Sequence, residues 1–330
     1  MPPKKKGGKK KSPKVDAKRE DVLLFVKLLR GMQKAAEIPN DHVIDQFVLK
    51  MNEGKGVPAL IFIDHVDIPN FKILCDALHE AKFDQLKSIR FANLHESAET
   101  CIKALAPYIG AKRFTCKLEE LHITNSVLND ESLNVLASAL KTNESINMLR
   151  LDYCKIGSDG FEILSSGLAC NPQIRSLSFQ FCDLDHCCAI SFSRTLIFID
   201  SHIEELNLRG NKLGLSGVLE ILSVGCRRAK HLRYINLADN KLTDSPELID
   251  GLAAVMRSRT NIERYSLVGN LLTDATAGPL ITLLSTAAHI KSLTLPVSCS
   301  NATLKLLDNT LANGKPKKGK KKGKKKSAKK

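Results

Sequence analysis

Apolar residues recur along the chain in a fixed frame, which is clearest in three copies: "IEELNLRGNKLG" from Ile203, "LRYINLADNKLT" from Leu232 and "IERYSLVGNLLT" from Ile262. With the first residue as offset 0, apolar residues stand at offsets 0, 3 and 5, Asn at offset 8 and Leu at offset 10. Further copies start at residues 57, 86, 118, 146, 174 and 290, so that consecutive starts are 28 to 32 residues apart. A period of this length is typical of a stacked repeat protein.

The first half of each frame predicts a short strand followed by a tight turn. Apolar residues at offsets 3 and 5 have the period of two of a strand, so they face the core while offsets 2, 4 and 6 face the other way. At offset 8, the amide groups of Asn211, Asn240 and Asn270 can satisfy turn backbone that would otherwise be buried unpaired. Cys154 and Cys182 fill the same position in two earlier copies.

The second half of each frame predicts a helix. Leu133, Leu136 and Leu140 stand at offsets 15, 18 and 22, the stripe of an amphipathic helix, and three other copies repeat it. Gly157 and Gly214 mark the turn that leads into the helix. One strand, turn and helix cannot bury its apolar face alone, so successive units stack into a curved parallel sheet with the helices outside.

The frame resembles the leucine-rich repeat, LxxLxLxxN/CxL, and the step length with Cys at offset 8 is similar to the ribonuclease-inhibitor subfamily. The resemblance covers about four fifths of the chain and implies an α/β fold, a horseshoe solenoid with a parallel inner sheet and outer helices.

Charge and pattern divide the chain into four parts. Residues 1–14 and 313–330 hold seven and eleven lysines and no acid, so they carry +18 of a net charge of +15, and the body sums to −3. We expect both ends to be disordered tails. Residues 15–56 predict a helical N-terminal cap with helices over 16–38 and 40–54, and residues 57–312 predict the repeat domain, which ends in a helix over "NATLKLLDNTLAN".

No motif predicts an enzyme, a cofactor or a metal site. "GKPKKGKK" from Gly314 resembles a phosphate-binding loop, but Lys321 stands where Ser or Thr is needed. "DHCC" from Asp185 contains three metal-ligand types without a second pair at a usual spacing, so we favour a packed or exposed helix start. His122 is more simply explained as a surface contact on a strand than as a base. No apolar run is long enough to span a bilayer, so no membrane partner is predicted.

The surface formed by offsets 2, 4, 6 and 7 is free to bind a partner, because the repeat does not need these side chains for its core. Arginine and aromatic residues dominate typical binding hot spots. We therefore predict a protein partner on the concave face, contacted by Arg150, Tyr153, Phe181, Arg209, Tyr234 and Arg264. The alternative is that each of these side chains only solvates or stiffens the sheet.

The tails predict an acidic partner. Lysine without aromatic residues attracts any polyanion but offers no platform for stacking bases. The lysines concerned are Lys4, Lys5, Lys6, Lys9, Lys10, Lys11, Lys317, Lys318, Lys320, Lys321, Lys322, Lys324, Lys325 and Lys326. Solubility or nuclear import is the simpler explanation.

"MPPKKKGGKKK" resembles the openings of many axonemal proteins of cilia and flagella. With the repeats, this resemblance implies a scaffold of a microtubule-based structure in the cytoplasm. It also implies a monomer within a larger assembly, in which the tails of this protein bind an acidic filament or the tails of tubulin. Nucleic acid, in a nuclear or RNA-associated factor, is the alternative partner. The Ran GTPase-activating proteins share the repeat type but typically carry an acidic tail, so a small-GTPase regulator comes third.

Overall fold

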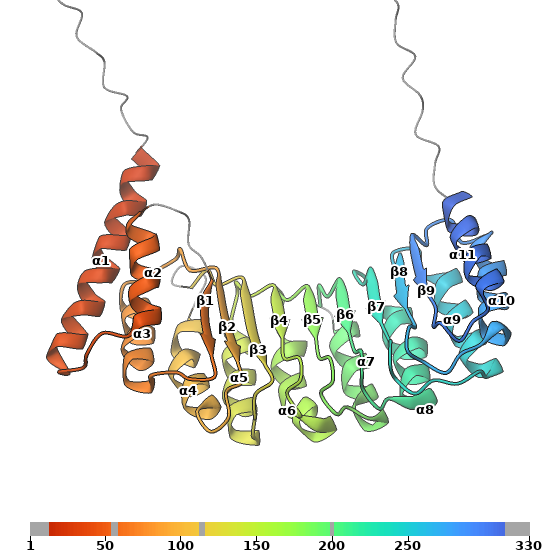
Figure 1. Ribbon diagram of the computed structural model, residues 1–330, viewed down its shortest axis with the longest axis horizontal. Helices are drawn as coiled ribbons and strands as arrows, with labels where there is room; N and C mark the ends of the chain where they lie inside the picture. The colour runs from red at the N-terminus through yellow and green to blue at the C-terminus, as the bar shows by residue number, and fades with distance from the viewer. Residues whose placement is uncertain (1–12, 54–58, 112–115, 199–200, 314–330) are drawn as a thin grey trace, which may run out of the picture.

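A computed structural model describes residues 13–53, 59–111, 116–198 and 201–313. Nine strands form one parallel sheet in which each strand pairs with the next in sequence order. The strands line the inner side of a curved arc and the helices lie along its outer side (Figure 1). The strands are β1 (Leu60–Ile63), β2 (Ser88–Ala92), β3 (Glu120–Thr124), β4 (Met148–Arg150), β5 (Ser176–Ser178), β6 (Glu205–Asn207), β7 (Tyr234–Asn236), β8 (Arg264–Ser266) and β9 (Ser292–Thr294).

The helices alternate with the strands after a helical N-terminus. They are α1 (Pro13–Ala35), α2 (His42–Asn52), α3 (Ile68–Glu80), α4 (Ala98–Ile109), α5 (Asp130–Thr142), α6 (Gly157–Ala169), α7 (Ala189–Ile197), α8 (Gly214–Glu220), α9 (Pro246–Ser258), α10 (Asp274–Leu284) and α11 (Asn301–Asn313). A short 3₁₀ helix, η1 (His186–Cys188), precedes α7, and a π-helical segment, η2 (Ile221–Cys226), continues α8.

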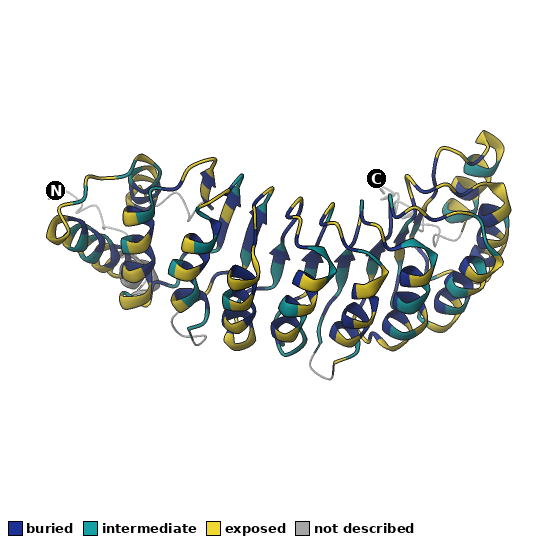
Figure 2. Ribbon diagram, turned by 90° about the horizontal axis from the view of Figure 1, so that it is seen from below, coloured by how far each residue is buried: buried dark blue, intermediate teal, exposed yellow. Residues whose placement is uncertain are grey.

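This arrangement confirms the leucine-rich-repeat horseshoe that the nine frames predict. Leu206 is the register partner of Ile235, and Ile235 is the partner of Tyr265, on adjoining parallel strands. All three side chains, at offset 3, are buried. Figure 2 shows that the strands are mainly buried or intermediate, whereas much of the helices is exposed. The helical stripe is also as predicted, because Leu133, Leu136 and Leu140 are buried against the sheet.

An asparagine at offset 8 holds the turn after the strand in the repeats of β6, β7 and β8. Oδ1 of Asn270 accepts hydrogen bonds from the backbone N–H groups of Asn240 (2.9 Å) and Leu242 (3.1 Å). Its Nδ2 donates to the carbonyl oxygens of Leu237 and Leu267, each at 2.9 Å. The amide therefore joins the turns of two neighbouring repeats, as predicted for this position.

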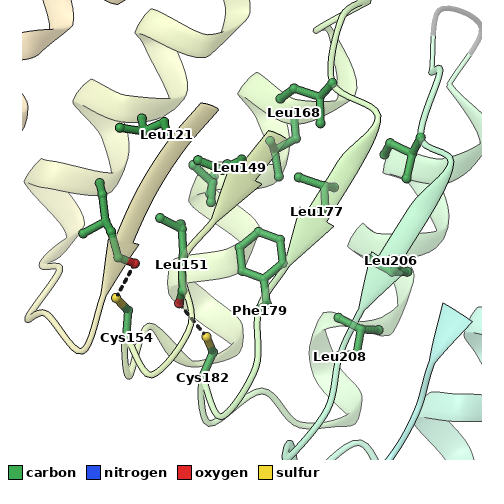
Figure 3. Close-up of a cluster of buried hydrophobic side chains, with 14 of the residues drawn as sticks. Leu121, Leu149, Leu151, Cys154, Leu168, Leu177, Phe179, Cys182, Leu206 and Leu208 are labelled. Carbon is green, nitrogen blue, oxygen red and sulfur yellow. Dashed lines mark hydrogen bonds between the residues drawn. The ribbon is translucent and has the colours of Figure 1, made fainter. Parts of the chain in front are cut away.

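The two cysteines at offset 8 make only part of this network. The thiol of Cys154 donates to the carbonyl of Ile123 at 3.3 Å, and that of Cys182 donates to Leu151 at 3.0 Å (Figure 3). A thiol thus replaces the amide donor toward the preceding repeat but offers no comparable acceptor.

Helices α1 and α2 cover the N-terminal end of the repeats, where the sequence predicts helices. The ring of Phe25 in α1 stacks on Phe83, which follows α3, at a centroid distance of 4.7 Å. Buried Gln33 donates to Oδ1 of Asn70 in α3 at 2.6 Å. α1 begins at Pro13, inside the range 1–14 predicted as a tail, and proline suits a first helical position because its missing N–H is not needed there.

Among the helices of the described residues, none combines the length and the apolar character that crossing a bilayer requires. The lysine-rich ends, residues 1–12 and 314–330, lie outside the described residues. Their predicted disorder and their predicted polyanion binding therefore stay predictions.

Candidate functional site

The concave surface carries the six predicted binding residues on five adjacent repeats, β4 to β8. Two of the three arginines donate hydrogen bonds to carboxylates of the same surface. Nε of Arg209 donates to Oδ2 of Asp239 at 2.7 Å, and Nη2 of Arg264 donates to Oε1 of Glu205 at 2.6 Å. The guanidinium of Arg264 also lies 4.8 Å from the ring centroid of Tyr234, which makes a cation–π contact. These arginines are held in place by the protein itself.

Tyr153 and Phe181 form an exposed aromatic pair. Their rings stack with centroids 5.0 Å apart and an interplanar angle of 10°. Tyr153 is 52% exposed and Phe181 is 37% exposed. The guanidinium of Arg209 lies 5.9 Å from the centroid of the Phe181 ring. The structure therefore brings three of the predicted residues, Tyr153, Phe181 and Arg209, into one cluster at the edge of the sheet where the strands end.

The backbone at this edge is left-handed in eight consecutive repeats. The residue at offset 7 has a φ between +46° and +74° in each of them, and we call these residues the left-handed row. In the first seven of these repeats, the N–H group donates to the carbonyl at offset 6 of the next repeat, as from Tyr153 to Gln180 at 2.7 Å and from Phe181 to Arg209 at 2.9 Å. The row consists of Asp64, Asn93, Asn125, Tyr153, Phe181, Gly210, Asp239 and Gly269.

The occupants of the left-handed row differ in how well they suit it. Asn, Asp and Gly tolerate a positive φ, whereas a bulky side chain there is an outlier. The two aromatic residues are the only members of the row that are strained, at φ values of 61° and 52°. A left-handed conformation costs a residue with a Cβ about 1–2 kcal/mol. Sequence reasoning selected both residues as aromatic but missed the strain, although Asn, Asp or Gly at the same offset in six other repeats was the available signal.

Gly210 makes room for the pair. A Cβ at position 210 would lie 2.3 Å from atoms of the Phe181 ring, so any larger residue would displace the ring. Its φ of 74° also favours glycine. The ring of Phe181 therefore packs over the backbone of the next repeat and leaves Tyr153 as the more exposed member.

Arg150 differs from the other predicted arginines. Its Nε lies 3.5 Å from Oδ2 of Asp152 and makes no hydrogen bond. The Asp152 carboxylate is buried and accepts three hydrogen bonds: from Oγ of Ser178 (2.6 Å), and from the backbone N (2.9 Å) and Nε2 (2.9 Å) of Gln180. Asp152 is thus fixed by β5 and the turn after it, and Arg150 rests against it.

His122 is not the surface contact that the sequence suggests. It is buried between the register partners Arg90 and Arg150, and its Nε2 lies 3.7 Å from Oε2 of Glu120 without a hydrogen bond. Burial, followed by the charges of Arg150 and Arg90, lowers the pKa of His122. The imidazole is therefore neutral at pH 7.

The opposite edge of the concave face, at offset 1, carries charges of alternating sign that neutralise one another. Lys87 pairs with Glu119 at 2.8 Å, and Arg175 pairs with Glu204 at 2.9 Å. Lys291 and Glu263 form a further pair at 2.5 Å. Salt bridges between exposed groups contribute little to stability. Each of these charges nevertheless has a neighbour of opposite sign on the same edge.

Asp185, His186 and Cys187 are the group whose ligand atoms lie close enough to hold a metal among the described residues, within 4.8 Å of one another. Their geometry serves a helix start instead. The Asp185 carboxylate accepts from Oγ of Ser158 (2.6 Å) and from the backbone N of Cys187 (2.8 Å), which lowers its pKa. Its hydrogen bond and charge raise the pKa of the Cys187 thiol, which opposes the thiolate form that a metal needs.

A comparison with known protein families agrees with the repeat pattern. A family model described as "Leucine Rich repeat" matches residues 200–222 and 228–245, which span two of the predicted repeats. Among solved structures, the chain is similar to an internalin from Listeria monocytogenes, with 11% sequence identity and a TM-score of 0.31, over 85% of this chain and 92% of that chain.

Proposed function

We propose that this protein is a non-catalytic scaffold, which binds a protein partner on its concave face and an acidic surface through its lysine-rich ends. The observation that carries the proposal is the Tyr153–Phe181 pair. Both residues keep a strained backbone and an exposed ring where asparagine serves in the neighbouring repeats β2 and β3. Strain of this kind is kept at functional sites more often than elsewhere.

The pair has the properties of a binding hot spot. Aromatic side chains supply a large contact area with few rotatable bonds, and they are enriched among the residues that dominate binding energies. The surrounding ion pairs Arg209–Asp239 and Arg264–Glu205 hold their side chains in place before a partner arrives. Preordered side chains lower the entropy lost on association.

A comparison of partner sets would test the concave face. The double substitution Tyr153→Asn and Phe181→Asn introduces the residue that Asn93 and Asn125 already provide in the row. Ile190→Asn, which changes an exposed residue of the outer helix α7, is the matched control. With quantitative cross-linking in cells, we expect one or more proteins to be lost from the double variant and kept by the control. Identical partner sets for all three proteins would contradict the proposal.

For the tails we propose a microtubule-based structure, such as the axoneme of a cilium or flagellum, as the acidic filament. The support is the charge, with seven and eleven lysines and no acid in the two ends, and the resemblance of residues 1–11 to axonemal openings. The glutamate-rich tails of tubulin suit such lysines, since the attraction is electrostatic and needs no shape.

Cosedimentation of the full-length chain with microtubules would test this second part. Binding should fall sharply when the acidic tubulin tails are removed by protease, and full binding to trimmed microtubules would contradict it. RNA is the competing polyanion. If eight lysines met phosphates, affinity for RNA would fall by about 10³ to 10⁵ between 50 and 200 mM salt.

A further inference from the structure

We propose that the occupant of the concave face is an acidic protein segment, in which a carboxylate pairs with Arg150 while a neighbouring apolar side chain lies on the ring of Tyr153. This inference rests on the proposed function, because it names the chemistry of the partner at that site. It depends on a difference between Arg150 and the other arginines of the concave face.

Arg150 has a free guanidinium edge. Arg90, Arg209 and Arg264 each donate a hydrogen bond to a carboxylate of this chain, namely Glu120 (3.1 Å), Asp239 (2.7 Å) and Glu205 (2.6 Å). Neither Nη group of Arg150 has a hydrogen-bond partner within the part of the chain that the structure describes. Its side chain is 43% exposed.

The free edge is nevertheless held in position. Nε of Arg150 is buried against the Asp152 carboxylate, and that carboxylate is fixed by its hydrogen bonds with Ser178 and Gln180. A guanidinium with Nε turned inward presents its two Nη groups together, which is the arrangement that binds a carboxylate with two parallel hydrogen bonds. Because the side chain is already oriented, less entropy is lost when the carboxylate binds.

The same repeat supplies the rest of the docking strip. Arg150 is the last residue of β4, and Tyr153 and Lys155 follow it along the chain after the strand ends. Lys155 is exposed and forms no ion pair with the described residues. The order of cation, aromatic ring and cation is complementary to a segment with carboxylates on both sides of an apolar side chain.

The balance of charge favours a protein segment over nucleic acid. The concave positions hold four arginines, Arg90, Arg150, Arg209 and Arg264, against five carboxylates, Asp64, Glu120, Asp152, Glu205 and Asp239. A phosphate backbone binds to rows of unpaired cations, which this surface does not provide. One free guanidinium edge suits one carboxylate.

The experiment uses the full-length chain and a fluorescent peptide that carries a central phenylalanine between two runs of three glutamates. Binding of the peptide is measured by fluorescence anisotropy at one salt concentration. The tails also attract this peptide, but they are the same in every variant. Differences between variants therefore report on the concave face. We expect Arg150→Gln to weaken binding about fivefold to tenfold, as expected for the loss of a partly exposed charged hydrogen bond. Arg150→Lys, which keeps the charge and loses the paired Nη groups, should recover only part of it.

Arg90→Gln is the matched control, because it removes the same charge from the same face but from a guanidinium that Glu120 already holds. We expect it to change affinity less than about twofold. Equal losses in the two variants would overturn the inference, since they would show an unspecific effect of charge. Circular dichroism would establish that each variant is folded.

Further outcomes separate this inference from the proposed function. If Tyr153→Asn with Phe181→Asn weakens peptide binding and Arg150→Gln does not, the concave site stands and its preference for a carboxylate is refuted. If neither change matters, the acidic segment is refuted as the occupant, while the proposed function still depends on the partner sets of the double variant. If an oligouridylate of equal charge binds with the same dependence on Arg150, the acidic protein segment is refuted in favour of a phosphate ligand.

Discussion

The ring of Tyr153 stacks on the ring of Phe181 at a centroid distance of 5.0 Å, and both residues have a left-handed backbone. Two effects of opposite sign meet in this pair. The stacked contact stabilises the fold by about 0.5–1.5 kcal/mol beyond area burial, whereas the left-handed backbone costs about 1–2 kcal/mol for each residue. The apolar area that the two partly exposed rings bury offsets the rest of the strain, so the pair contributes little net stability.

Replacing both aromatic residues by asparagine should leave the protein nearly as stable as before. We expect the free energy of unfolding of the Tyr153→Asn, Phe181→Asn variant to lie within about 1 kcal/mol of the wild-type value, because relief of strain offsets the lost contact. Urea denaturation would measure it. A loss of about 4 kcal/mol would instead mean that the pair is part of the core.

The hydrogen bonds of Asn240 and Asn270 predict that the same substitution has unequal effects on stability at these two positions, although they look alike in the sequence. Asn270 uses all four of its hydrogen bonds, whereas Oδ1 of buried Asn240 accepts none among the described residues. Cysteine at either position keeps a donor and loses the acceptor, as Cys182 demonstrates. Asn270→Cys leaves two buried N–H groups unpaired and should cost about 2–4 kcal/mol, while Asn240→Cys should cost about 1 kcal/mol. Thermal unfolding would compare the stability of the two variants. Equal losses of stability would contradict the hydrogen-bond pattern described for Asn240 and Asn270.

The periodic part of this fold could be predicted because each repeat must bury the same positions. All nine starts correspond to observed strands, and Asn211 and Asn270 at offset 8 use both donor and acceptor as expected. Asn240 uses only its donors among the described residues. The function of single concave residues was less predictable. Arg150 and Arg209 look equivalent in the sequence, but only contacts across repeats show that Asp239 holds one while Asp152 is occupied by Ser178 and Gln180. These contacts join residues of neighbouring repeats, so the sequence pattern of a single repeat does not predict them.

Close packing between α5 and α6 predicts that Gly167 cannot be replaced. A Cβ at position 167 would lie 2.2 Å from the backbone oxygen of Ala137, and backbone cannot move aside as a side chain can. Gly167→Ala should therefore destabilise the protein by about 1–3 kcal/mol or more.

Gly278→Ala in α10 is the control, because its Cβ would meet no atom within 4 Å. The control should be neutral or stabilising by up to about 1 kcal/mol, since alanine is the better helix former. Chemical denaturation of both variants tests the pair, and a tolerated Gly167→Ala would contradict the α5–α6 contact.

Buried His122 predicts that the protein becomes less stable in mild acid. Its pKa in the folded state is lowered, by burial first and then by the charges of Arg150 and Arg90, while Glu120 and Asp152 oppose the shift. In the unfolded chain a histidine titrates near pH 6.5. As the pH falls through about 6.5, the unfolded state therefore takes up a proton that the folded state does not, and the free energy of unfolding decreases with a slope of up to about 1.4 kcal/mol per pH unit. The loss stops growing once the pH is below the folded pKa.

His122→Gln removes the titration and should flatten this part of the stability curve. His95→Gln, at an exposed histidine between β2 and α4, is the control. Denaturation midpoints across the window would measure both variants, and an unchanged acid slope in His122→Gln would refute the assignment of the loss to this residue.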